Sequence, residues 1–533
     1  MILCFLKKNA FPVLLCLLVA AVLFPVMHNG FVDWDDMQYV VSNGALRGSW
    51  LDILTFFPGY YQPVTILTYK LEFVLFGLNP LPYHFTSLLL HLINCVSVFC
   101  LFRLLGARSG SAFLGALLFG IHPVNVEPAA WISGRKELLW AMFSFWALIA
   151  YLRFLSAGGR RLLAYSVSFF ILAVLSKPSA AVFPLIILLA DHYRGRAFGQ
   201  RLLAEKIPYL AVAVTGFLLS SSPSGFLLRA AGEGGSVLSA AGAAVQGALF
   251  YAGKFLVPLK LSAVYPPLEP LAAGAGLVLL LPALAAIAGF ALLRRRGVGK
   301  QPGGEGERPE PWKKAMFGLG FFLAAAIPGL IVSPPADRYA YVPAAGLCFL
   351  YGEFVFWLYR SARGAGGRFR AGAVAIIAVA HFLVLGGAAH SRAAVWKDSL
   401  TLWGDVLEKS PLEYMAYYGR GNARQTAGQY AGALEDFSRC FELNPAYWKA
   451  VANRGRTFAE LKKFDEAIAD YGRAIKICQD SPQLFLNRGN AYLLSGKTML
   501  AVKDYDSALA LAPGMAQAAE NRAKAKLRRP AGR

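Results

Sequence analysis

The sequence predicts an all-α protein in which a polytopic membrane domain of about 11 helical spans is followed by a helical repeat array. Hydrophobic residues make up 56% of the 533 residues and charged residues only 16%, below the roughly 25% of a soluble domain. Apolar runs of spanning length recur as far as residue 391. Beyond residue 396 the hydrophobicity falls and a repeated pattern begins.

The apolar runs predict the membrane helices in order. The run 9–27 follows Lys7-Lys8, and because no clear small-x-small cleavage site follows it, we interpret it as an uncleaved anchor rather than a signal peptide. The run 162–192 is either one kinked span or a hairpin with Ser176-Lys177-Pro178 at its tip; basic clusters on both sides favour the hairpin. The remaining runs are 83–104, 109–124, 138–154, 207–222, 236–257, 271–293, 315–333, 341–359 and 371–391.

The positions of Lys and Arg predict the orientation of these spans. If the run 236–257 crossed the membrane, the basic loop 294–314 would lie outside, so we interpret this run as an interfacial or re-entrant helix. The N-terminus is then cytoplasmic and the C-terminus extracytoplasmic, in what we expect to be a bacterial inner membrane. The net charge of +22 does not indicate nucleic-acid binding, because the basic residues flank apolar runs instead of forming one patch.

A 34-residue period predicts the C-terminal domain. Arg420-Gly421, Arg454-Gly455 and Arg488-Gly489 are each followed by alanine and then by an aromatic residue at fixed offsets. Small residues let two antiparallel helices approach, and the aromatic side chains fill the space between them. The pattern resembles the tetratricopeptide repeat, whose groove binds a protein or peptide. We assign a membrane domain to 1–395, a degenerate unit to 396–413, clear units to 414–447, 448–481 and 482–515, and a capping helix to 516–530.

An acidic stretch follows the first span. Asp35 and Asp36 lie in the first outer loop, where a carboxylate can remove the proton from an acceptor hydroxyl, so they are candidate catalytic residues. Asp33 is interpreted as a helix cap or a solvated turn residue. The amphipathic stretch 62–76 of the same loop is expected to lie on the membrane surface.

Several isolated cations also fall in outer loops, where positive charge is scarce and costly without a partner. A donor phosphate is one expected partner, because fixed cations stabilise an anionic leaving group. The alternative is pairing with local acids, Arg338 with Asp337 or Glu127, and Lys136 with Glu137. The candidate phosphate ligands are Arg135, Lys136, Lys177 and Arg338.

The remaining candidates have supporting roles. His84 and His91 lie seven residues apart on one face of a span and either order a headgroup or an aspartate, or simply pack in the core. Glu127, Asp337 and Tyr339 lie beside the cations. No metal-ligand or C-x-x-C spacing occurs among the seven cysteines and the histidines, so neither a metal site nor a cofactor is expected.

These residues, taken in order, resemble the transmembrane and tetratricopeptide-repeat (TMTC-like) O-mannosyltransferases of the GT-C glycosyltransferase superfamily. The resemblance covers nearly the whole chain. Its motifs include Trp34-Asp35-Asp36, Tyr61-Gln62-Pro63-Val64-Thr65, His122-Pro123, Trp131-Ile132-Ser133-Gly134-Arg135-Lys136, Leu175-Ser176-Lys177-Pro178, Ala336-Asp337-Arg338-Tyr339-Ala340-Tyr341 and Trp396-Lys397-Asp398-Ser399.

The resemblance implies a GT-C fold with Asp35 as the first choice for the base and Asp36 in support. It also implies transfer of a sugar, commonly mannose, from a polyprenyl- or dolichyl-phosphate donor to Ser/Thr of exported proteins. A direct in-line displacement would invert the anomeric centre. Two alternatives remain open: a non-enzymatic membrane-anchored repeat scaffold, and a glycosyltransferase that acts on a cell-surface glycan or lipid.

Overall fold

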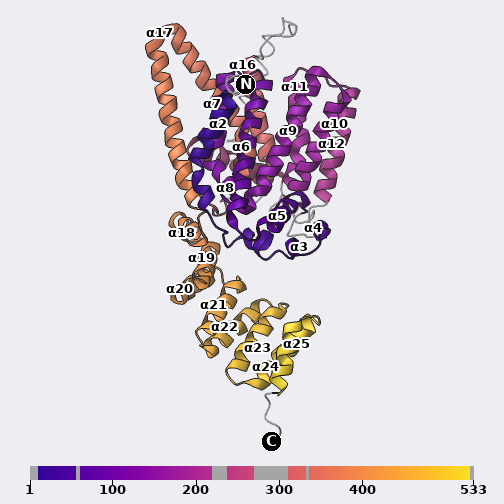
Figure 1. Cartoon of the computed structure of the whole chain (residues 1–533), viewed down its shortest axis with the longest axis vertical. Coiled ribbons are helices and arrows are strands. Elements are labelled where there is room, and N and C mark those ends of the chain that lie inside the picture. Colours follow the sequence, from indigo (N-terminus) through magenta and orange to yellow (C-terminus); the bar gives the residue numbers. More distant parts are fainter. Residues whose placement is uncertain (1–9, 56–60, 219–236, 269–309, 332–334, 528–533) are drawn as a thin grey trace. The chain divides into compact units, whose positions relative to one another are not determined.

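The computed structural model describes residues 10–55, 61–218, 237–268, 310–331 and 335–527, and its parts are helices and connecting loops without a strand in these ranges. The chain divides into two compact units, Met1–Asp398 and Ser399–Arg533. The apolar helices of the first unit and the repeat helices of the second are shown in Figure 1. The prediction of an all-α protein is confirmed.

The first unit is built from long apolar helices joined by short segments of 3-10 or π helix. Five helices in the described ranges are long and apolar enough to cross a membrane, or six if one bent pair counts as a single span. The expected number of about 11 spans is therefore not confirmed, and the run 271–293 lies outside the described residues. The main helices are α2 (Ala10–Val22), α5 (Pro63–Phe76), α6 (Pro80–Leu104), α7 (Ser109–Ile121), α9 (Arg135–Ala157), α10 (Arg160–Ser176), α11 (Phe183–Tyr193), α12 (Gln200–Leu218), α14 (Val237–Leu256), α16 (Pro311–Ile331) and α17 (Tyr341–Ala394).

Short helical segments connect these helices at one end of the unit and carry most of the candidate site. They interrupt the long helices where proline or glycine stops helix propagation: η3 begins at Pro123 and η5 at Pro178. The helix pair on either side of His122 is bent by 58°. The segments are η1 (Phe24–His28), η2 (Met37–Val41), α3 (Gly44–Arg47), α4 (Asp52–Thr55), η3 (Pro123–Asn125), α8 (Val126–Ala130), η4 (Ile132–Gly134), η5 (Pro178–Val182) and η6 (Asp337–Ala340).

Small residues bring α7 and α17 into backbone contact. A Cβ atom added at Gly352 would lie 2.4 Å from the carbonyl oxygen of Ser111, and one added at Gly115 would lie 2.6 Å from that of Cys348. This close approach is typical of helix packing in membranes. Van der Waals contact drives helix association there, and small residues let the two backbones come close enough for it. Farther along, α17 bends at Gly367, whose φ of 68° lies in the left-handed region, and Figure 1 shows its two arms.

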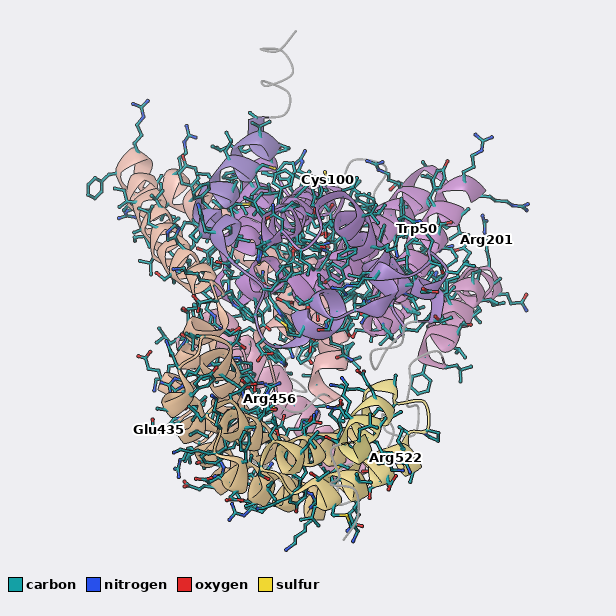
Figure 2. All side chains as sticks on the ribbon, turned by 60° about the horizontal axis from the view of Figure 1, so that its bottom comes forward. Trp50, Cys100, Arg201, Glu435, Arg456 and Arg522 are labelled. Atoms are coloured by element: carbon teal, nitrogen blue, oxygen red, sulfur yellow. The ribbon has the colours of Figure 1, made fainter. Side chains whose placement is uncertain are left out.

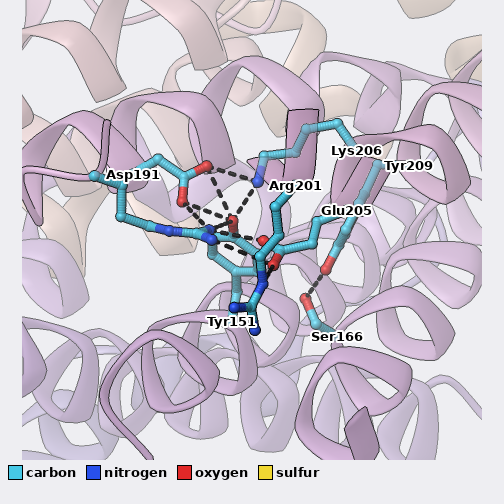
Figure 3. Close-up of polar contacts among 8 residues, drawn as sticks. Tyr151, Ser166, Asp191, Arg201, Glu205, Lys206 and Tyr209 are labelled. Carbon is cyan, nitrogen blue, oxygen red and sulfur yellow. Dashed lines mark hydrogen bonds and ion pairs between the residues drawn. The ribbon is translucent and has the colours of Figure 1, made fainter. Parts of the chain in front are cut away.

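A second buried charge cluster joins α9, α11 and α12 (Figure 3). The Asp191 carboxylate lies 2.6 Å from Lys206 and 2.9 Å from Arg196, and it accepts a 2.7 Å hydrogen bond from the hydroxyl of Tyr151. Arg196 also pairs with Glu205 at 2.7 Å. The exposed Arg201 also lies 3.6 Å from Glu205. Asp191 and Glu205 balance the charges of Lys206 and Arg196, so the cluster joins the three helices without leaving a net charge buried.

The second unit is an array of helix pairs. Each pair is closed by an ion pair between an arginine of the first helix and an aspartate sixteen residues later, as Arg454 and Asp470 show with bonds of 2.7 and 2.8 Å. Arg456, labelled in Figure 2, lies in the middle pair. Its guanidinium donates a hydrogen bond to Gln425 of the preceding pair, which links neighbouring repeats. The helices are α18 (Ser399–Lys409), α19 (Tyr414–Thr426), α20 (Tyr430–Leu443), α21 (Trp448–Glu460), α22 (Phe464–Ile477), α23 (Pro482–Leu494), α24 (Thr498–Leu511) and α25 (Ala516–Leu527).

Candidate active site

The two adjacent aspartates of the first loop have different environments. Asp36 is fully buried and accepts hydrogen bonds from the backbone N–H of Val32 at 3.1 Å and of Ser133 at 2.9 Å. The Ser133 hydroxyl donates a third bond of 2.5 Å. Asp36 thus fixes its own loop and fastens it to η4, 97 residues away in the chain.

Burial raises the pKa of Asp36 to about 6, because desolvation penalises the charged form more than the three hydrogen bonds favour it. The negative charge of Asp35 adds to this increase in the pKa. The Asp36 carboxyl group therefore changes its charge close to neutral pH, whereas an ordinary aspartate does so near pH 4.

The raised pKa of Asp36 predicts a stability change with pH. Between about pH 4 and pH 6 the folded state binds more protons at Asp36 than the unfolded state does, so this group's contribution to the free energy of unfolding falls as pH rises. Thermal unfolding of the purified chain and of Asp36→Asn measures the effect. We expect the unfolding temperature of the wild type to drop by several degrees relative to the variant across this range. Parallel curves would contradict the assignment.

Asp35, in contrast, is the accessible carboxylate. Its side chain is 31% exposed and lies 2.9 Å from the Nζ atom of Lys136. Burial by itself raises the pKa of Asp35, but the charge and hydrogen bond of Lys136, together with the charge of Arg338, outweigh it and hold the pKa below its usual value. Asp35 is therefore ionised at neutral pH and available to a substrate on its exposed side.

Arg338 is the second cation that acts on Asp35. Its guanidinium donates a 2.7 Å hydrogen bond to Glu127, whose side chain is 1% exposed. The guanidinium also lies 5.1 Å from the ring centroid of Trp34 and 5.4 Å from that of Trp131. Glu127 and two indole rings thus hold one positive charge beside the loop that carries Asp35.

Lys177 brings a third cation near Arg338. It is paired with Glu137 and lies 5.0 Å from the ring centroid of Tyr339, which itself lies 4.9 Å from the Arg338 guanidinium. The hypothesis that Lys136 pairs with Glu137 is wrong, because Lys136 bonds to Asp35 and Glu137 bonds to Lys177. The alternative pairing of Arg338 with Glu127 is confirmed.

Arg135 does not join these cations. Its side chain is fully buried, and its guanidinium is paired with Glu72 and donates a 2.7 Å hydrogen bond to the carbonyl oxygen of Tyr83. It also lies 4.7 Å from the ring centroid of Tyr69. The expectation that Arg135 binds a phosphate is not supported by this geometry; Arg135 packs α5 and α6 against α9 instead. The stretch 62–76, expected on the membrane surface, is largely α5, which buries Ile66, Tyr69 and Glu72.

The remaining candidates support the site from a distance. Asp337 accepts a 2.6 Å hydrogen bond from Tyr265 and lies 3.7 Å from Arg392. One imidazole nitrogen of His84 lies 3.3 Å from the carbonyl oxygen of Gly30. His91 is buried between the Tyr341 hydroxyl at 2.8 Å and the Gly120 carbonyl at 2.9 Å, so packing is its role here. Within the described ranges no group of three or more His, Cys, Asp or Glu residues is arranged to hold a metal ion.

Three stacked tryptophans complete the site, and none of them was a candidate site residue in the sequence. The ring centroids of Trp34 and Trp131 lie 4.9 Å apart, and the fully buried Trp396 lies 5.6 Å from Trp131 and 6.5 Å from Trp34. Two hydrogen bonds fix the same junction: Gly30 N–H to Lys397 O at 2.8 Å and Asn29 Nδ2 to Ala393 O at 3.1 Å. The segment after the last membrane helix therefore packs on the loop of Asp35. Each tryptophan stands in one of the motifs that carry the family resemblance, which was the available signal.

Family models match parts of both units. The family model described as dolichyl-phosphate-mannose-protein mannosyltransferase matches residues 61–224, a range that includes Lys136 and Lys177 but not Asp35. Two tetratricopeptide-repeat models match residues 416–447 and 455–496. The matches therefore fall in both units.

Curated relatives are similar over shorter stretches. Protein O-mannosyl-transferase TMTC1 of Homo sapiens is 35% identical over 99 residues, which is 18% of this chain and 11% of that protein. Protein O-mannosyl-transferase TMTC3 of Homo sapiens is 33% identical over 93 residues, 17% of this chain and 10% of that protein. The match thus spans about a tenth of the length of these relatives. Among solved structures, the second TPR domain of the human RPAP3 protein in complex with an HSP70 peptide is 29% identical, with coverage of 22% of this chain and 97% of that chain and a TM-score of 0.21.

Proposed function

We propose that this TMTC-like chain of the GT-C superfamily is a membrane mannosyltransferase that moves a mannosyl or other hexosyl group from a polyprenyl-phosphate donor to Ser/Thr hydroxyls of exported proteins. The family model that matches residues 61–224 and the names of the curated relatives support the class of reaction. The observation that carries the proposal is the exposed carboxylate of Asp35 beside the cations Lys136 and Arg338.

The chemistry divides between these groups. Asp35 accepts the proton of the acceptor hydroxyl while the hydroxyl oxygen forms a bond to the anomeric carbon. The bond from that carbon to the donor phosphate breaks, and its electron pair leaves with the lipid phosphate. Lys136, Arg338 and Lys177 stabilise the negative charge that develops there. Attack on the face opposite the phosphate inverts the anomeric centre.

The ion pair between Asp35 and Lys136 gives the donor a second role. A phosphate that binds Lys136 competes with Asp35 for the same ammonium group. Lys136 and Arg338, which hold the pKa of Asp35 low, would then also interact with the phosphate, so the pKa of Asp35 would rise. Donor binding would thus make Asp35 a stronger base at the moment when a base is needed. The repeats, in this proposal, bind the acceptor protein, and the site faces the extracytoplasmic side.

The test is transfer by the purified chain in detergent. The donor is polyprenyl-phosphate mannose, polyprenyl-phosphate glucose is the comparison, and a Ser/Thr-rich peptide is the acceptor. We expect the peptide to gain one hexose mass in intact-mass spectrometry, and the sugar still bound to the peptide to show the inverted anomeric configuration. No mass gain from either donor, with a peptide mixture derived from exported proteins as acceptor, would contradict the proposal.

A further inference from the structure

A basic cavity lies at the start of α7 and beside the first arm of α17. Its volume is about 400 Å³, within the range of roughly 300–1,000 Å³ that small-molecule pockets have. The lining residues are Arg108, Phe356, Tyr359, Arg360, Arg363 and Gly364. Three guanidinium-bearing side chains and two aromatic rings thus surround one cavity, and nothing in the proposed transfer reaction uses them.

The charge of this cavity is not neutralised by the neighbouring acid. Arg360 and Arg363 are exposed, and neither forms an ion pair within the part of the chain that the structure describes. Glu353, on the same helix, is held by Lys314 at 2.6 Å and by the hydroxyl of Ser111 at 2.5 Å. Arg360 and Arg363 therefore leave positive charge at the cavity.

The N-terminus of α7 adds to this positive charge. The helix begins at Ser109, and the side chain of its N-cap residue, Arg108, makes no capping hydrogen bond. The first N–H groups of a helix point toward its N-terminus and favour an anion there. The guanidinium groups and this helix end together are suited to a phosphate group.

The cavity lies one membrane thickness from the candidate active site. From Tyr341, next to Arg338, to Arg360 the helix rises about 29 Å at 1.5 Å per residue, which matches a hydrocarbon core of about 30 Å. Phe354 and Trp357 project from the same stretch of α17 with exposures of 56% and 60%. Exposed aromatic side chains at the end of an apolar span are typical of the membrane–water interface.

We infer that this cavity binds the phosphate group of an anionic glycerophospholipid headgroup. The guanidinium groups of Arg360 and Arg363 bind the phosphate oxygens, while Phe356 and Tyr359 form the wall next to the glycerol part of the headgroup. Phe354 and Trp357 are exposed next to the cavity, at the expected depth of the membrane–water interface. This position favours a lipid over a soluble phosphate. The inference rests on this cavity and not on the proposed transferase activity.

Native mass spectrometry of the full chain in detergent tests it, with phosphatidylglycerol, zwitterionic phosphatidylcholine and inorganic phosphate as separate probes. The test variant is Arg360→Gln/Arg363→Gln. The matched control is Arg368→Gln/Arg370→Gln, which removes the same charge from exposed positions of α17 that do not line the cavity. We expect the test variant alone to lose phosphatidylglycerol affinity by about tenfold or more, since each interfacial arginine contributes roughly fivefold.

The outcomes separate the sources of the phosphate. Selective loss of phosphatidylglycerol binding in the test variant supports the lipid site. Displacement of the bound lipid by millimolar inorganic phosphate would overturn the lipid assignment and assign the same residues to a soluble phosphate. Equal loss in the test and control pairs would overturn the inference, because binding would then follow total charge. Unchanged affinity in the test variant, with its fold verified by thermal unfolding, would overturn it too.

Discussion

Asp35→Asn is expected to lower the rate of hexose transfer by about 10²–10⁴, the usual contribution of a positioned general base. The variant keeps the shape of the side chain but cannot accept the proton of the acceptor hydroxyl. Because Asp35 is 31% exposed and one of its carboxylate oxygens pairs with Lys136, we expect the substitution to leave the fold intact. The measurement is the single-turnover rate with saturating donor, together with the unfolding temperature.

Two neighbouring variants act as controls for Asp35. Asp33→Asn lies in the same loop and removes a charge two residues away, so it reports on loop electrostatics without removing the base. Asp36→Asn removes the fully buried carboxylate that accepts three hydrogen bonds, so it lowers the unfolding temperature as well as the rate. Transfer by Asp35→Asn at the wild-type rate would show that another group takes the proton.

Arg338→Gln is expected to reduce transfer by about 10²–10³, because it removes a positive charge aimed at the leaving phosphate. The same substitution leaves Glu127 buried, 1% exposed, without its cation. A buried charge that loses its partner costs about 3–5 kcal/mol, so the variant should also unfold at a lower temperature. Rate and unfolding temperature are therefore both measured.

The double variant Arg338→Gln/Glu127→Gln separates the two effects. It removes the unpaired charge, so the unfolding temperature should recover toward the wild-type value while the transfer rate stays low. Recovery of both quantities would mean that Arg338 only neutralises Glu127. Loss of stability without loss of rate in Arg338→Gln would lead to the same conclusion.

Features that depend on local periodicity could be predicted from the sequence. Arg420, Arg454 and Arg488 marked the repeats, because an array repeats the same contacts at the same spacing. The matching aspartates, Asp436, Asp470 and Asp504, follow the same 34-residue period and pair with them. These aspartates could therefore be predicted from the same period.

The pairing of charges within the site could not be predicted in the same way. Lys136 and Glu137 are adjacent in sequence, but successive residues of a helix point about 100° apart, so Lys136 bonds to Asp35 and Glu137 to Lys177. The distinction between Asp35 and Asp36 depends on burial by η4, almost a hundred residues later. Such contacts follow from tertiary packing, which a single sequence does not specify locally.

The packing of Trp396 on Trp34 and Trp131 limits how this protein can be divided or recombined. The residues that follow the last membrane helix pack on the first loop. Trp396 stacks with Trp34 and Trp131, and the backbone N–H of Gly30 donates a hydrogen bond to the carbonyl oxygen of Lys397. A chimera that joins a different repeat array before Trp396 would remove the side chain that packs on Trp34 in the loop of Asp35. A junction between Asp398 and Ser399 keeps that contact, so exchange of the repeat array has its natural boundary there.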